Sequence, residues 1–120
     1  FNWLGYEGNN MVMTADLGET KQFRTLQMNF LKAVESWVFL PEKVTLEISQ
    51  DGRNFIEVAT LSGDNSDRNY LQKSIPFVME FEPVKARYLR ISAISMLTCP
   101  EWHRGFGSPS WIFVDEMILE

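Results

Sequence analysis

The sequence predicts an all-β fold, an antiparallel β-sandwich of the jelly-roll type. Along most of the chain apolar residues alternate with polar ones, which is the period of a half-buried strand. Turn-forming residues separate these segments at short spacing, and no segment has the length and period of a stable helix. The 120 residues suit one domain with its own core, so residues 1–120 are expected to form a single module.

Two candidate strands lie in the first third of the chain. Residues 11–17 form the first strand, which ends at Gly18. In the second strand Leu26, Met28 and Phe30 alternate with polar residues. Because successive side chains of a strand point to opposite sides, these three residues should share one buried face.

A hairpin is predicted next. Val44, Leu46 and Ile48 again alternate with polar residues, and Asp51-Gly52 follows them. This dipeptide favours a tight hairpin turn because glycine tolerates a positive φ. Residues 55–61 are then the returning strand.

Three more candidate strands complete the sandwich. Two of them have one apolar face each, formed by Phe77, Met79 and Phe81 in one strand and by Leu89, Ile91 and Ala93 in the other. The last, residues 111–119, is apolar on both sides apart from Asp115 and Glu116, which predicts a central strand covered on each face. The total of roughly seven strands without intervening helices is typical of a sandwich.

The remaining segments are predicted to be loops. Residues 63–69 and 100–110 are rich in turn-forming residues, and only residues 20–22 and 32–37 could form a helical turn. The oxygen-bearing side chains of residues 63–69 lack the spacing of a calcium-binding EF-hand loop. This segment is therefore either a solvated loop or a rim that touches a ligand.

Composition and charge exclude several classes of partner. Eleven Lys and Arg stand against sixteen Asp and Glu, which gives a net charge of -5 and disfavours binding to nucleic acids or to anionic membranes. The longest apolar runs are far shorter than the roughly 20 residues that a membrane-spanning helix needs. We therefore expect no membrane insertion, and we expect any export signal to belong to a longer parent chain.

The residues that usually carry catalysis are few. Cys99 is the only cysteine and His103 the only histidine, which excludes an internal disulfide and a Cys/His metal pair. Asp115 and Glu116 are adjacent in a predicted strand, so their side chains should point to opposite faces rather than form a catalytic carboxylate pair. The sequence therefore predicts a binding module rather than an enzyme.

One candidate binding segment lies in the loop of residues 100–110. Trp102, His103 and Arg104 place an aromatic plate, an imidazole and a guanidinium group together. Sugar-binding sites need a flat apolar surface for the pyranose ring and a few fixed polar groups for its hydroxyls. The alternative is that Trp102 packs beneath the loop and His103 hydrogen-bonds to the backbone.

A second candidate segment precedes the hairpin. Trp37 and Phe39 should face the same side if this segment is extended, with Lys32 and Glu35 as polar partners of a ligand. The alternative is that both aromatic residues pack against Phe30 in the core and that the two charged residues are ordinary solvated groups.

Three phrases of the sequence resemble one known family. They are Thr14-Ala15-Asp16-Leu17-Gly18, then Ser49 with Asp51-Gly52-Arg53-Asn54-Phe55, and finally Ala86-Arg87-Tyr88-Leu89-Arg90-Ile91. In this order they resemble the coagulation factor 5/8 type C family, also called discoidin, whose bacterial branch overlaps carbohydrate-binding module family 32. The resemblance implies a galactose-binding-domain-like jelly roll.

Further segments narrow the resemblance. Residues 3–8, 36–41, 100–107 and 111–116 are similar to the C-terminal module of family 20 β-hexosaminidases, the chitobiase-type enzymes, of Bacteroides-type bacteria. This implies the C-terminal, noncatalytic module of a larger secreted glycoside hydrolase in the periplasm or at the outer surface. Its partner would be a glycan that contains N-acetylhexosamine or galactose. The alternative is a structural module that docks on the parent catalytic domain and has no glycan ligand.

The resemblance also bears on calcium and on sugar specificity. Calcium is a frequent structural ion in the wider family, and Glu116 occupies the position of its C-terminal calcium-linked glutamate, so Glu116 is the candidate metal ligand. Galactose-binding members carry an Arg and an Asn where this chain has Lys32, Glu35 and Ser36. The identity of the sugar therefore stays open.

Overall fold

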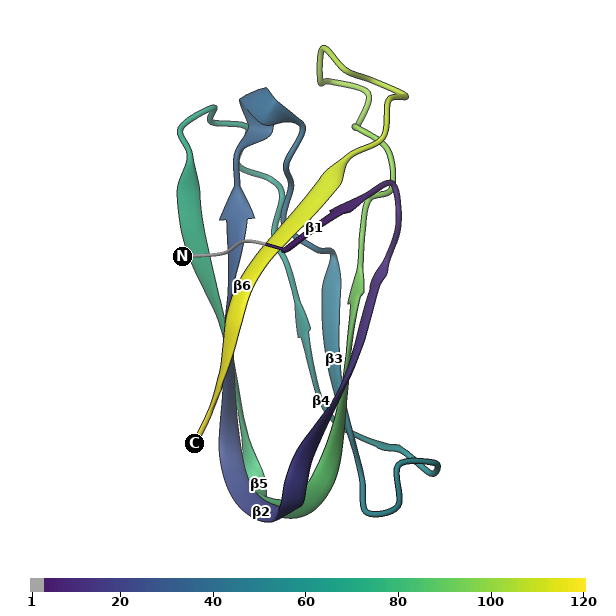
Figure 1. The fold of residues 1–120 in the computed structure, drawn as a ribbon. Coiled ribbons are helices and arrows are strands. Elements are labelled where there is room, and N and C mark those ends of the chain that lie inside the picture. The colour runs from purple at the N-terminus through teal and green to yellow at the C-terminus, as the bar shows by residue number, and fades with distance from the viewer. Residues whose placement is uncertain (1–3) are drawn as a thin grey trace.

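The computed structural model describes the backbone of residues 4–120 and the side chains of residues 5–120, except that of residue 116. Within this part of the chain it contains six strands and one short 3-10 helix (Figure 1). The elements are β1 (Leu4–Glu7), β2 (Met11–Lys32), η1 (Val34–Ser36), β3 (Lys43–Ser49), β4 (Ile56–Ser62), β5 (Lys73–Ile94) and β6 (Trp111–Leu119).

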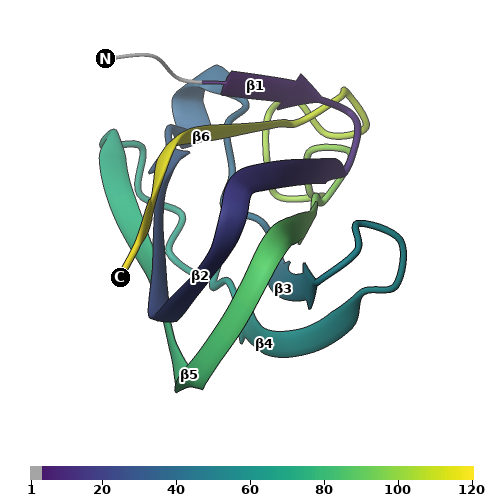
Figure 2. The same cartoon turned by 60° about the horizontal axis from the view of Figure 1, so that its bottom comes forward.

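The strands form one antiparallel sheet, in the order β1-β6-β2-β5-β3-β4, that curls into two layers. Strands β2 and β5 are long, and both bend at the end of the molecule opposite η1, so that each contributes to both layers (Figures 1 and 2). This arrangement confirms the predicted antiparallel β-sandwich.

A bulge explains the bend. Residues 11–16 of β2 pair with residues 88–93 of β5, and the register shifts between Asp16 and Lys21 before pairing resumes. Gly18 has a φ of 85° in this interval, and its N–H donates to Oδ1 of Asp16 at 2.8 Å. Extra residues in one strand increase its local bend and twist, which lets β2 pass from one layer to the other.

The same bulge accounts for differences from the predicted elements. The candidate strands 11–17 and 26–30 are two halves of β2, because the chain bends at the bulge without leaving the sheet. Of the two segments that could form a helical turn, residues 20–22 are instead part of β2, whereas residues 32–37 contain the short helix η1. Strand β1 was not predicted, because four residues at a sheet edge leave little periodicity to detect.

The predicted hairpin between β3 and β4 is confirmed. Gly52 has a φ of 77°, and the Asp51 carboxylate accepts the backbone N–H groups of Arg53 and Asn54, each at 2.9 Å. These hydrogen bonds hold the pKa of the Asp51 carboxyl well below its ordinary value. The turn is thus stabilised by its own side chains.

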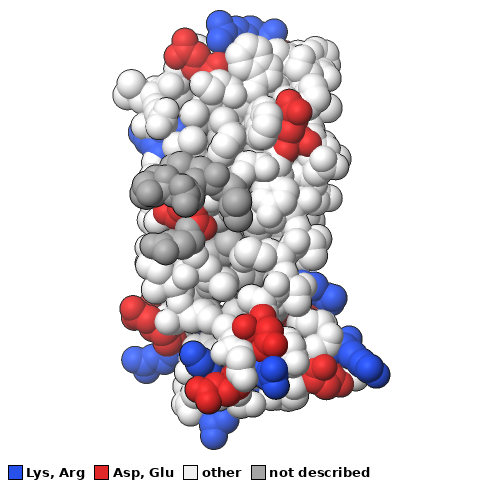
Figure 3. All heavy atoms as spheres, viewed as in Figure 1, with Lys and Arg blue, Asp and Glu red and all other residues white. Residues whose placement is uncertain are grey.

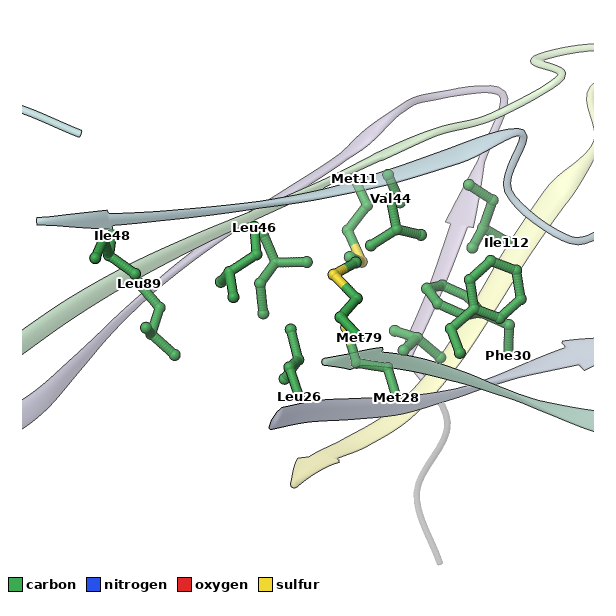
Figure 4. Packing of buried hydrophobic residues seen from close by; sticks show 14 of the residues in the cluster. Met11, Leu26, Met28, Phe30, Val44, Leu46, Ile48, Met79, Leu89 and Ile112 are labelled. Atoms are coloured by element: carbon green, nitrogen blue, oxygen red, sulfur yellow. The ribbon is translucent and has the colours of Figure 1, made fainter. Parts of the chain in front are cut away.

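The core lies between the two layers (Figure 4). Phe30 from β2 is fully buried, and its ring packs edge-on against Phe77 from β5 at a centroid distance of 4.8 Å. The predicted buried faces are confirmed except at Phe81, which is only half-buried at the margin of the core. The other predicted residues are all less than a tenth exposed: Leu26, Met28, Phe30, Val44, Leu46, Ile48, Phe77, Met79, Leu89, Ile91 and Ala93.

The prediction that residues 111–119 are covered on both faces is wrong. Ile112 and Val114 of β6 are buried toward the core, but Trp111 and Phe113 are half-buried and Ile118 is 43% exposed. The described strands form only two layers, so no other described strand covers the outer face of β6. None of the helices in the described residues has the length and apolar character needed to span a membrane.

Candidate functional site

Three connecting segments lie together at one end of the sandwich, opposite the β3–β4 hairpin (Figure 1). They are residues 33–41, 63–72 and 95–110, and we call this region the loop end. Isolated bridges join Val38 to Ala33 and to Trp111. The side-chain amide of Asn65 bonds both backbone groups of Leu40, at 3.0 and 2.9 Å.

The backbone around η1 positions Trp37. Trp37 adopts a left-handed conformation with a φ of 63°, and its N–H donates to the Val34 carbonyl at 3.2 Å. Its carbonyl accepts the N–H of Trp111 at 2.8 Å, and the Trp111 carbonyl accepts the N–H of Phe39 at 3.1 Å. The segment is therefore anchored to β6, and the Trp37 side chain is left half-buried.

His103 connects two parts of the loop end. It is 3% exposed; its Nδ1 accepts the N–H of Gly105 at 2.9 Å, and its Nε2 lies 2.7 Å from the Val34 carbonyl oxygen. Since Nδ1 is an acceptor, the hydrogen bonds assign the neutral tautomer with the proton on Nε2, which donates to Val34. The imidazole thus ties residues 103–105 to η1.

Three aromatic side chains surround this imidazole. The ring centroids of Trp37, Phe39 and Trp102 lie 5.2, 5.3 and 5.8 Å from that of His103, all close to perpendicular. Val34 and Cys99 complete a small hydrophobic core that is separate from the main one. The alternative that Phe39 packs in a core is therefore confirmed, but its partners are the residues of this small core and not Phe30.

An arginine side chain lies over the indole ring of each of the two loop-end tryptophans, Trp37 and Trp102. The guanidinium carbon of Arg104 lies 4.9 Å from the Trp37 ring centroid, and that of Arg68 lies 4.8 Å from the Trp102 centroid. Arg104 also donates from Nη2 to the Glu35 carbonyl oxygen at 3.1 Å. Cation–π contacts of this kind hold the guanidinium groups beside the half-exposed indoles.

The structure brings several predicted site residues together. Trp37 and Trp102 are half-buried, whereas Glu35 and Arg104 are exposed. Phe39 and His103 are 2% and 3% exposed. Both side chains pack inside the small core beneath the indoles, so the indoles and not these two side chains face outward here.

Sequence reasoning missed Arg68 as an individual residue. It lies in the loop of residues 63–69, which was treated as a possible rim. Its contact with Trp102 joins positions 34 residues apart, and no local pattern signals such a contact.

Lys32 lies in a different environment. Its side chain is 4% exposed, and its Nζ lies 3.1 Å from Oδ2 of Asp67. It lines a hollow of about 320 Å³ beside residues 61–64. The N–H of Asn69 and the Lys32 ammonium group together hold the pKa of the Asp67 carboxyl below its ordinary value.

The described side chains do not by themselves form a calcium site. The side chain of Glu116, the predicted ligand, lies outside the described residues. Asp115 accepts hydrogen bonds from the backbone N–H and side-chain amide of Asn29, at 3.2 and 3.0 Å. Among the side chains that the structure describes, no three of His, Cys, Asp or Glu gather in a metal-binding group. The described donor set thus does not fit a cation that needs six to eight oxygen ligands.

Charges of both signs are interspersed on the face seen in Figure 3. Lys and Arg and Asp and Glu side chains lie mainly toward its two ends. Outside the grey residues, this face therefore shows no continuous field of one sign.

Comparisons with known proteins agree with this architecture. The F5/8 type C domain family matches residues 2–115. No curated protein matches the chain in sequence.

Several solved structures have the same fold. Chitosan-binding module 1 of a chitosanase/glucanase from Paenibacillus sp. IK-5 is 18% identical with a TM-score of 0.59, and the match covers 94% of this chain and 70% of that one. CpGH89CBM32-6 from Clostridium perfringens is 14% identical with a TM-score of 0.58, covering 97% and 75%. The family 32 carbohydrate-binding module of AlyQ, in complex with 4,5-unsaturated mannuronic acid, is 17% identical with a TM-score of 0.56, covering 98% and 76%.

At these identities the structural likeness shows the fold alone. The family match spans nearly the whole chain, and the two-layer antiparallel sandwich agrees with it. The chain therefore belongs to the F5/8 type C domain family.

Proposed function

We propose that this domain is a noncatalytic module that binds glycans through its loop end. The observation that carries the proposal is the pair of half-exposed indoles, Trp37 and Trp102, each beside an arginine and both resting on the His103 core. An indole offers an apolar plate to the C–H face of a pyranose ring, and a guanidinium group donates hydrogen bonds to its hydroxyls.

The small core prepares this surface before a ligand arrives. His103 is hydrogen-bonded at both ring nitrogens and packs against three aromatic rings, so neighbouring side chains have little freedom to lose. Binding to a preorganised surface avoids the entropic cost of ordering it. Phe39 and His103 thus act as supports rather than as contacts.

The proposed context is a larger exported enzyme. The resemblance of residues 36–41, 100–107 and 111–116 to the C-terminal module of family 20 β-hexosaminidases supports a chitobiase-type parent of a Bacteroides-type bacterium, secreted to the periplasm or outer surface. Structural neighbours that are carbohydrate-binding modules, one of them described as chitosan-binding, support a glycan partner. A tethered module of this kind raises the local concentration of a catalytic domain at its polymer.

A binding titration tests the proposal. The domain is titrated by NMR with N-acetylglucosamine, galactose, chitobiose and lactose, and the indole signals of Trp37 and Trp102 are followed. We expect saturable shifts with at least one sugar. Trp102→Ala and Arg104→Ala should weaken that binding about tenfold, the effect of losing one stacking or charge-assisted contact.

Arg53→Ala is the matched control for Arg104→Ala. Arg53 is an exposed arginine of the β3–β4 hairpin, at the opposite end of the molecule. If no sugar moves any indole signal, or if Arg53→Ala weakens binding as much as Arg104→Ala, glycan binding at the loop end is rejected.

One observation favours the alternative of docking without a ligand. Val78 and Ile118 are 44% and 43% exposed, and both lie directly opposite Gln27 in their ladders, so the three side chains share the outer face. An apolar pair on a sandwich face suits contact with another domain. Docking without a glycan ligand would be favoured if no sugar binds and if, in a longer parent chain, this outer face contacts the catalytic domain.

A further inference from the structure

A hollow opens between the edges of the two layers. The N-terminal half of β5 is the outer strand of one layer and β4 is the outer strand of the other, and the hollow lies where they approach beneath the loop end. Its volume is about 320 Å³, at the small end of the range of about 300–1,000 Å³ typical of small-molecule sites. Its apolar lining comes from Leu40, Leu61, Ile75, Pro76 and Phe77.

Two lysines meet at this hollow. Lys32 at the end of β2 lies directly opposite Lys73 at the start of β5, and like charges at such positions are unfavourable. The Lys32 side chain is also 4% exposed, and burial of an ammonium group has a further cost. Oδ2 of Asp67 lies 3.1 Å from Nζ of Lys32 and 3.8 Å from Nζ of Lys73. The Asp67 carboxylate therefore offsets part of the cost of placing the two ammonium groups together. Costly arrangements of this kind concentrate at functional sites.

Hydrogen bonds fix the loop that contains Asp67 at one side of the hollow. Asn65 clamps the loop onto both backbone groups of Leu40, and the N–H of Gly63 donates to the Glu42 carbonyl at 2.9 Å. Oδ1 of Asp67 accepts the N–H of Asn69 at 3.0 Å, which directs Oδ2 toward Lys32. The donor and acceptor are therefore fixed relative to each other without a ligand.

The chemistry of the lining selects a neutral polyol. Two ammonium groups, Lys32 and Lys73, and two carboxylates, Asp64 and Asp67, line the hollow, so its formal charge is zero. A charged ligand gains no net attraction from such a set. An ammonium donor beside a carboxylate acceptor matches two neighbouring hydroxyls of a sugar, one accepting from Lys32 and one donating to Asp67. The apolar lining then meets the C–H groups of the ring.

From these features we infer that the hollow is a second sugar subsite that holds one neutral pyranose unit of a glycan, with Lys32 as hydrogen-bond donor and Asp67 as acceptor. The inference rests on the proposed function, because Asp67 faces the hollow while the next residue, Arg68, lies on the Trp102 ring. A single glycan chain that crosses the loop of residues 63–69 can therefore contact both the hollow and the Trp102 indole. The module therefore prefers oligosaccharides to single sugars.

Titration by NMR and calorimetry tests the subsite. The probes are N-acetylglucosamine and its β-1,4-linked trimer, and galactose and a galactotriose. In the unaltered domain we expect one trimer to bind more tightly than its monosaccharide and to shift the amide signals of residues 62–64 and 73–75. Lys32→Met should weaken binding of that trimer about tenfold, as expected for loss of a charge-assisted hydrogen bond.

Two further variants keep the test decisive. Ser62→Trp fills the mouth of the hollow from an exposed position and should weaken trimer binding even if Lys32→Met perturbs the fold. Lys43→Met is the control, because Lys43 is an exposed lysine paired with Ser62 in the β3–β4 ladder but outside the lining. It removes the same charge and should bind as the unaltered domain does.

The outcomes separate the two proposals. If a trimer shifts signals of residues 100–106 but none of the lining, and both hollow variants bind it normally, the second subsite is overturned while glycan binding at the loop end stands. If no probe binds the unaltered domain, both proposals are overturned.

Discussion

Gly105 donates its backbone N–H to Nδ1 of His103 at 2.9 Å, inside the loop end. The other ring nitrogen is 2.7 Å from the Val34 carbonyl oxygen, so this one side chain satisfies two backbone groups. His103→Ala leaves both groups unpaired and opens a void among the aromatic rings. We expect the free energy of unfolding to fall by about 2–4 kcal/mol, measured by urea denaturation.

Phe106→Ala is the control for this loss. Phe106 lies in the same loop but is 66% exposed, so its removal should change the free energy of unfolding by about 0.5 kcal/mol or less. Equal effects of the two substitutions would show that the His103 bonds do not stabilise the loop end.

Gly105 is also needed for close packing. A Cβ at this position would overlap the Trp37 indole, whereas a Cβ at Gly107 would meet no atom within 4 Å. Gly105→Ala should therefore displace the indole, shift the tryptophan fluorescence and cost about 1–3 kcal/mol of stability.

Gly107→Ala isolates the backbone contribution. Gly107 has a φ of 85°, so this substitution strains the backbone by about 1 kcal/mol but leaves Trp37 in place. A fluorescence shift in Gly107→Ala as large as that in Gly105→Ala would contradict the packing explanation.

The Glu47–Arg90 pair predicts a pH dependence of stability. Arg90 donates two hydrogen bonds to the Glu47 carboxylate, at 3.0 and 3.1 Å, and these hold its pKa below the ordinary value of 4.5. The folded protein therefore releases this proton more readily than the unfolded chain. The stabilisation that the Glu47–Arg90 pair gives the folded state is present above pH 4.5 and is lost as the pH falls through the lower pKa of Glu47 in the folded state.

Glu47→Gln should lower the stability at pH 7 by about 0.5–1 kcal/mol and flatten its decline below pH 4.5. Chemical denaturation between pH 3 and pH 7 measures both effects. Glu82→Gln removes an exposed carboxylate and should leave the curve unchanged. Parallel curves for Glu47→Gln and the unaltered domain would refute the assignment.

The thiol of Cys99 should be unreactive in the folded domain. Cys99 is 1% exposed in the small core, and burial raises the pKa of its thiol above the ordinary value of 9.0. Both effects reduce the thiolate that reacts. A disulfide exchange reagent at pH 8 should label the protein in urea but only slowly in buffer; rapid labelling in buffer would contradict a closed core.

The strand pattern shows how far the sequence could be interpreted. Alternation in residues 44–48 and the Asp51-Gly52 turn are local signals, and the hairpin they predict is present. The bulge after Asp16 contains a local signal, Gly18, but a glycine is equally typical of a strand end. Only the bend of β5 beside it shows that the chain stays in the sheet. Two long strands were therefore predicted as four shorter ones.

The candidate site shows the same division. Aromatic and charged residues in two loops were visible in the sequence, and the structure places Trp37, Trp102 and Arg104 at one end of the molecule. The sequence did not show which of them face solvent. Burial of Phe39 and His103 depends on partners more than 60 residues away along the chain.

The sequence by itself thus determined most of the strand segments, the hairpin and the aromatic composition of the loops, since each follows from the period or turn chemistry of a few consecutive residues. Only the tertiary structure decided the layer each strand joins, the support of the indoles by His103, and the pairing of Lys32 with Asp67 across 35 positions. The physical reason is that burial and ion pairing depend on contacts between distant segments, and one chain's local pattern does not encode which segments meet.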